Sequence, residues 1–139
     1  ELEYYDNNID IKEMHKRMIY NSIYDQINMN TFNFVNAAFD NLLFRYPTQN
    51  EFNNSYFMIE DKQPFTIFGF SGSNKLDFTN LICDSREFYE GIIQWSYLSM
   101  LARTPTSIER DFLMNDFYIT NDFQKLQRFI MTTDEYAHF

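Results

Sequence analysis

Apolar residues recur three and four positions apart along most of this chain, which is the spacing of an amphipathic α-helix. The stripes comprise Met14, Met18, Ile23 and Ile27, then Phe32, Val35, Phe39, Leu42 and Leu43, and later Phe88, Tyr89, Ile92, Ile93, Trp95, Leu98, Ser99 and Leu101. We predict helices over residues 10–27, 31–45, 48–59, 75–83, 85–103, 107–115, 122–131 and from 132 onward. Three Gly and three Pro are too few for many β-hairpins. The pattern therefore indicates a single all-α domain spanning residues 1–139.

Two segments share the pattern L-x-R-x-P-T-x-x-E, at Leu43–Glu51 and again at Leu101–Glu109. A second shared pattern follows each of them, because Phe78–Phe88 matches Leu126–Tyr136 in its apolar, polar and acidic positions. Self-similarity of this kind is typical of helical repeat proteins. We therefore predict a helical bundle built from two unequal copies of a helix-turn-helix unit.

The predicted copies occupy residues 31–88 and 89–139, after an N-terminal helix within residues 1–30. The first copy has an insertion at about 60–76, where two glycines and a proline indicate a loop. Because the chain begins at Glu1 without Met, we expect a mature or excised piece from which a leader has been removed. Because it ends just after the predicted helix start at Thr132, we expect either a fragment of a longer repeat array or a last turn that is an end cap.

The repeated motif has the chemistry of a helix start. In Pro-Thr-x-x-Glu the Thr side chain can accept from the backbone N–H three residues on, while the Glu reaches back to the Thr N–H, which is a capping box. We predict further boxes that begin at Asp10, Asp84 and Thr132. Each motif Arg would end the preceding helix and pair with an acidic helix start; anion binding is the alternative. The predicted structural motif residues are Arg45, Pro47, Thr48, Glu51, Arg103, Pro105, Thr106, Glu109, Glu87 and Glu135.

The insertion is unusually apolar for a loop. It carries Phe65, Ile67, Phe68 and Phe70, which either pack back onto the core or form a surface for a protein partner. These four residues are the candidate partner-binding site. We expect Trp95 to belong to the core.

Charge and composition exclude several classes of function. The net charge is −9, and no cluster of Lys and Arg interrupts it, so we expect no nucleic-acid binding. No apolar stretch approaches the roughly 20 residues that span a bilayer. Cys83 is the only cysteine, which excludes an internal disulfide, and we expect it to be a buried small hydrophobe.

No constellation of residues indicates catalysis or metal binding. His15 and His138 lie far apart in the sequence, and neither has a carboxylate at a recognised ligand spacing. The carboxylate pairs Asp111/Asp116 and Glu60/Asp61 have no companion nucleophile and suit a solvated surface. We therefore expect no enzymatic activity, no cofactor and no metal.

The order of helix, L-x-R-x-P-T-x-x-E, helix, and then S/T-x-E-F/Y resembles a family of small bacterial helical modules. The family includes the phycobilisome linker domain and linker-like repeats of surface-layer and secreted proteins. Residues 92–139 resemble them most, and the R-x-P-T-x-x-E signature is also similar to one in helical domains attached to planctomycete cytochrome-like proteins. Phycobilisome linkers are typically basic, whereas this chain is acidic, so the resemblance implies the architecture more than the partner.

The function that follows is a scaffold or linker module that binds a protein partner or neighbouring repeats. The resemblance implies a bacterial cell-envelope or secreted assembly, and thus an extracytoplasmic location. The alternative is an accessory helical domain of a larger enzyme or electron-transfer protein, with catalysis elsewhere in that protein.

Overall fold

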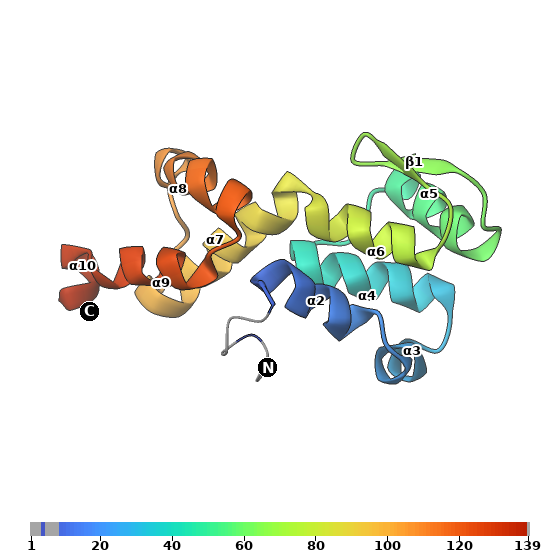
Figure 1. Ribbon diagram of the computed structural model, residues 1–139, viewed down its shortest axis with the longest axis horizontal. Helices are drawn as coiled ribbons and strands as arrows, with labels where there is room; N and C mark the ends of the chain where they lie inside the picture. Colours follow the sequence, from blue (N-terminus) through green and yellow to red (C-terminus); the bar gives the residue numbers. More distant parts are fainter. Residues whose placement is uncertain (1–3, 5–8, 139) are drawn as a thin grey trace. The chain divides into compact units, whose positions relative to one another are not determined.

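The computed structural model describes Tyr4 and residues 9–138, and Figure 1 shows that they are mostly helical. The predicted all-α class is confirmed at this level, and one small two-stranded sheet is added to it. The chain forms two compact units: Lys12–Ser85, and the residues from Arg86 onward together with the segment that ends at Ile11. Among the described residues, no helix has both the length and the apolar content needed to cross a membrane.

The unit Lys12–Ser85 contains five helices and a β-hairpin among its described residues. In chain order they are α2 (Ile11–Ile19), α3 (Ser22–Asn28), α4 (Thr31–Leu43), α5 (Gln49–Glu60), β1 (Phe65–Ile67), β2 (Phe70–Gly72) and α6 (Lys75–Asp84). Its core is centred on Phe39, Met58, Phe78 and Ile82, which are all fully buried. Helix α4 packs against α3 and α5, and α5 also packs against α6 and β1.

The predicted continuous helix over residues 10–27 is wrong, because the chain breaks at Asn21. The Asn21 side chain accepts from Tyr24 N at 2.9 Å, which caps α3, and its amide donates to the carbonyl of Arg17 at 2.7 Å. A side chain that satisfies both helix ends competes with the backbone bonds of a continuous helix. The expected apolar stripe fails for the same reason: Met18, Ile23 and Ile27 are exposed, whereas Ile11 and Ile19 are buried.

The insertion in the first predicted copy is a β-hairpin rather than an irregular loop. Strands β1 and β2 are antiparallel, with Ile67 opposite Phe70. Phe68 and Gly69 form the connection and both have positive φ, 53° and 83°, which is the signature of a type I′ turn. The hairpin lies beside α5 in Figure 1, and Asn54 of α5 donates to the carbonyl of Thr66 at 2.9 Å.

Gly72 is the point where the hairpin approaches the helices most closely. A Cβ placed on it would lie 2.8 Å from Asp77 Cβ, 3.1 Å from Leu81 Cδ1 and 3.1 Å from Met58 Sδ. Replacing Gly72 with Ala is therefore expected to lower the free energy of unfolding by about 1–2 kcal/mol through overpacking. Urea denaturation followed by circular dichroism measures this. A Gly69→Ala variant is a useful comparison, because a Cβ there meets nothing within 4 Å and any cost comes from its φ of 83°.

The second unit is built around α7 (Arg86–Leu101), with α8 (Ser107–Thr120), α9 (Phe123–Met131) and α10 (Asp134–Ala137). Helices α8, α9 and α10 all pack against α7. Its buried residues include Phe88, Ile93, Phe117 and Ile130. The ring of Tyr89 meets that of Phe117 edge-on at 5.2 Å, and its hydroxyl bonds to Asn121. Helix α8 runs to Thr120, beyond its predicted end at 115, and stops where Asn121 adopts a left-handed conformation.

Three expectations about single residues in these helices are wrong. Trp95 is 48% exposed, and its ring lies 6.2 Å from that of Phe123. Asp84 is the last residue of α6 and pairs with Lys12 at 2.9 Å, so it does not open the next helix. Thr132 closes α9, and Thr133 caps α10 instead by accepting from Tyr136 N at 3.2 Å.

Candidate functional site

The first L-x-R-x-P-T-x-x-E segment forms a closed polar turn between α4 and α5. Phe44 ends α4 in a left-handed conformation, and Thr48 and Glu51 form the predicted capping box. Arg45 donates to both carboxylate oxygens of Glu51, at 2.8 and 2.9 Å, and also to the carbonyl of Tyr46 at 3.1 Å. We call this arrangement the first clasp, because the guanidinium ties the end of one helix to the start of the next.

The second segment forms a turn with the same bonds between α7 and α8, the second clasp. Thr106 and Glu109 form a capping box. Arg103 donates to both oxygens of Glu109 at 2.9 Å and to the carbonyl of Thr104 at 3.1 Å. It also donates to both oxygens of Glu135 at 2.8 Å, so one guanidinium holds two carboxylates. Bidentate Arg–carboxylate pairs of this kind are the strong, geometrically specific ones.

The electrostatics of the two clasps follow from these bonds. Hydrogen bonds from Arg45 and from Thr48 outweigh burial and hold the pKa of Glu51 at about 2. Arg103 and Thr106 do the same for Glu109, whose pKa is also about 2. Arg103 likewise holds the pKa of Glu135 below its usual range. Each guanidinium also lies over an aromatic ring of the preceding helix, Arg45 over Phe39 at 5.4 Å and Arg103 over Tyr97 at 5.1 Å.

These contacts favour the structural interpretation of the motif over anion binding. All three guanidinium nitrogens of Arg103 donate to Glu109, Glu135 or the carbonyl of Thr104. Pro47 and Pro105 directly precede the two capping threonines, where a proline ends the foregoing segment. Glu87 lies in the first turn of α7.

The four apolar residues of the insertion have different environments. Ile67 is buried, Phe68 lies 5.9 Å from the ring of Phe39, and Phe65 lies 5.8 Å from the ring of Phe57. Phe70 is 68% exposed. Three of the four therefore fold back onto the helices, and Phe70 alone of the four stays available to a partner.

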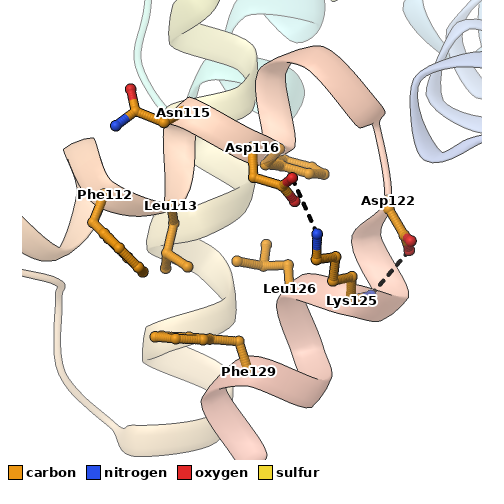
Figure 2. A pocket seen from close by; sticks show the side chains of 9 residues that line it. Phe112, Leu113, Asn115, Asp116, Asp122, Lys125, Leu126 and Phe129 are labelled. Atoms are coloured by element: carbon orange, nitrogen blue, oxygen red, sulfur yellow. Dashed lines mark hydrogen bonds and ion pairs between the residues drawn. The ribbon is translucent and has the colours of Figure 1, made fainter.

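A surface groove lies between α8 and α9, and sequence reasoning did not find it. Figure 2 shows its lining, with Leu113 and Leu126 facing each other across the groove. The rings of Phe112 and Phe129 lie 5.7 Å apart at one end, and Asp116 pairs with Lys125 at 3.1 Å towards the other. The groove has a volume of about 370 Å³.

Helix α8 exposes an apolar stripe that shares Phe112 with this groove. Ile108 is 83% exposed, Phe112 62% and Ile119 78%, at spacings of four and seven that place them on one face. The signal was present in the sequence, but apolar residues at helical spacing are usually buried, so the pattern alone does not separate a core face from an exposed one.

The remaining candidate residues of the sequence have ordinary surroundings. Cys83 is buried as expected, and burial raises the pKa of its thiol to about 12. Asp111 lies 3.6 Å from Arg110, and Glu60 accepts a hydrogen bond from Thr31. Within residues 4 and 9–138, no group of three or more His, Cys, Asp or Glu side chains is placed to hold a metal ion.

The chain matches no protein-family model, no curated protein and no solved structure.

Proposed function

We propose that this protein is a non-enzymatic helical interaction module, in which two unequal copies of one unit present apolar surface to a protein partner. The resemblance to bacterial linker modules adds the expectation of a cell-envelope or secreted assembly. The observation that carries the proposal is the apolar stripe of α8, where Ile108, Phe112 and Ile119 are all more than half exposed. Several exposed apolar residues on one face of a folded helix are typical of protein interfaces.

The two clasps support the relation between the copies. Residues 58 positions apart make the same bonds: Arg45 and Arg103 each donate to a Glu six residues on and to the carbonyl of the next residue. The left-handed residues before them, Phe44 and Ala102, also share the register, with φ of 58° and 55°. A repeated turn of this kind fixes the angle between two helices, which is what a scaffold unit requires.

Photo-crosslinking tests the proposal. A photoreactive amino acid replaces Ile119 in the full chain, expressed in its native cells, and a matched variant carries it at Gln94, an exposed polar position on α7. We expect one defined protein to be crosslinked from position 119 and not from position 94. Equal crosslinking from both positions, or none from position 119, would contradict an interaction function for this face.

A further inference from the structure

When the two copies are aligned, the groove between α8 and α9 corresponds to the surface of α5 and α6 that the β-hairpin covers in the first copy. In the unit Lys12–Ser85, the hairpin lies on α5 and α6. Four residues of these helices meet it: Asn54 bonds to the carbonyl of Thr66, and Met58, Asp77 and Leu81 surround Gly72. These contacts define the place of the hairpin in the first copy.

The counterparts of all four residues line the groove of the second copy. The clasps relate α5 to α8 by 58 positions, so Asn54 corresponds to Phe112 and Met58 to Asp116. The second shared pattern relates α6 to α9 by 48 positions. Asp77 then corresponds to Lys125 and Leu81 to Phe129, and both line the groove. The second copy has no hairpin of its own, because α8 and α9 are joined by Asn121 and Asp122 alone.

We propose that this groove is the docking site for an extended or hairpin segment of a partner protein. The segment is apolar, has a glycine where it approaches the groove most closely, and has basic residues beside that glycine. The proposal rests on the two-copy relation stated under the proposed function. It assigns the segment the place that β1 and β2 occupy in the first copy. The ligand of the groove is thus a polypeptide strand. The partner protein supplies it, whereas in the first copy the β-hairpin belongs to the same chain.

The apolar part of the assignment follows from the lining. Leu113 and Leu126 are buried, while Phe112 and Phe129 expose their rings on the same side. In the filled site, Phe65 and Ile67 supply the matching apolar side chains to α5 and its surroundings. Phe112 and Phe129 contact each other at 5.7 Å, so they offer one continuous aromatic surface, and an apolar side chain that packs against such a surface is a typical interface anchor.

The net charges of the groove lining and of the whole chain indicate the charge of the partner segment. Asp116, Asp122 and Lys125 give the lining a net charge of −1, within a chain of −9. In the filled site, the carboxylate of Asp77 accepts from the backbone N–H of Ser73 at 2.9 Å. The groove of the second copy also has a carboxylate, that of Asp116, but it lies on α8 rather than on the counterpart of α6. A basic segment is attracted by this surface, whereas a second copy of an equally acidic chain is repelled.

The probe for the test is a cyclic, fluorescein-labelled peptide with the sequence of residues 62–74, which contains the hairpin and Lys62. Its binding to the full-length chain is measured by fluorescence anisotropy. We expect saturable binding that Phe112→Ser weakens about tenfold or more. Asp111→Ser is the matched control on the same helix, at an exposed position outside both the groove lining and the apolar stripe, and should change the affinity less than about twofold. A peptide with Val in place of Gly72 should lose binding.

Three results would overturn the proposal. The first is the absence of saturable peptide binding, and the second is equal binding by the Phe112→Ser and wild-type chains. The third is a concentration-dependent dimer in sedimentation that Phe112→Ser abolishes, because a second copy would then be the occupant. Circular dichroism checks the fold of each variant, and Phe129→Ser serves as the second groove variant if Phe112→Ser unfolds. Position 119 lies outside the groove lining, so a partner can be crosslinked there even if the peptide does not bind the groove, and the two failures are distinguishable.

Discussion

Replacing Phe39 with Ala is expected to lower the free energy of unfolding of the unit Lys12–Ser85 by about 3–5 kcal/mol. Phe39 is fully buried in α4. Its ring lies 6.3 Å from that of Phe78 in the core and 5.9 Å from that of Phe68 in the hairpin turn. Arg45 of the first clasp lies over the same ring. The deletion therefore leaves a cavity at the point where core, hairpin and clasp meet.

Urea denaturation of purified chains measures this loss, with two matched variants. Phe39→Leu keeps most of the buried volume and should cost less than about 1.5 kcal/mol. Phe70→Ala removes an aromatic ring of the same hairpin that is mostly exposed, and should stay within about 0.5 kcal/mol of the wild type. A Phe39→Ala chain as stable as Phe70→Ala would mean that Phe39 is not at the centre of the core.

Acid is expected to destabilise the protein through the two clasps. The pKa values of Glu51 and Glu109 are about 2 in the folded protein, below the ordinary value of 4.5. A carboxylate with a lowered folded pKa contributes stability that is fully present above about pH 4.5 and is lost as the pH falls through about 2. Both carboxylates are partly exposed, so solvent screening reduces the gain, and we expect a combined loss of about 2–4 kcal/mol between pH 5 and pH 2.

The double variant Glu51→Gln/Glu109→Gln isolates this contribution. Its stability in urea, measured at several pH values, should fall less steeply below pH 4.5 than that of the wild type. Glu90→Gln removes a carboxylate of α7 outside both clasps and should leave the wild-type slope nearly unchanged. Identical slopes for the double variant and the wild type would show that the clasp carboxylates do not carry the acid sensitivity.

The clasps were the most predictable part of the fold, because their information is local. Pro-Thr-x-x-Glu places a helix stop, a cap and its reciprocal acceptor within five residues, and both predicted boxes at Thr48 and Thr106 are present. At Thr132 the same reasoning erred by one residue. Two adjacent threonines compete there, and Thr133 takes the cap.

The break at Asn21 and the hairpin were missed for a different reason. Each depends on how a single residue satisfies the backbone around it. Asn21 interrupts a segment whose apolar spacing continues on either side of it. Phe68 occupies a positive-φ turn position that normally takes Asn, Asp or Gly, and its ring contact with Phe39 accompanies that conformation. At Phe68, tertiary contact thus overrides the local signal, whereas the break at Asn21 is a local capping effect that the apolar spacing concealed.

The groove could not be predicted from the sequence, because it exists only where no other segment of the chain covers α8 and α9. Phe112 and Phe129 have the apolar character of buried residues, and the sequence contains no mark that separates them from Leu113 or Leu126. The distinction becomes visible only when α8 and α9 are placed in space and the hairpin of the other unit is compared with them.

The clasps also bear on the order in which the chain folds. Each Arg–Glu pair joins residues only six positions apart, so closing the turn costs little loop entropy. The helix pairs α4–α5 and α7–α8 can thus acquire their shape from local contacts before distant parts of the chain meet. The bond from Arg103 to Glu135 spans 32 residues and closes a much longer loop. We therefore expect the same guanidinium to pair with Glu109 early and with Glu135 late, when α10 joins the second unit.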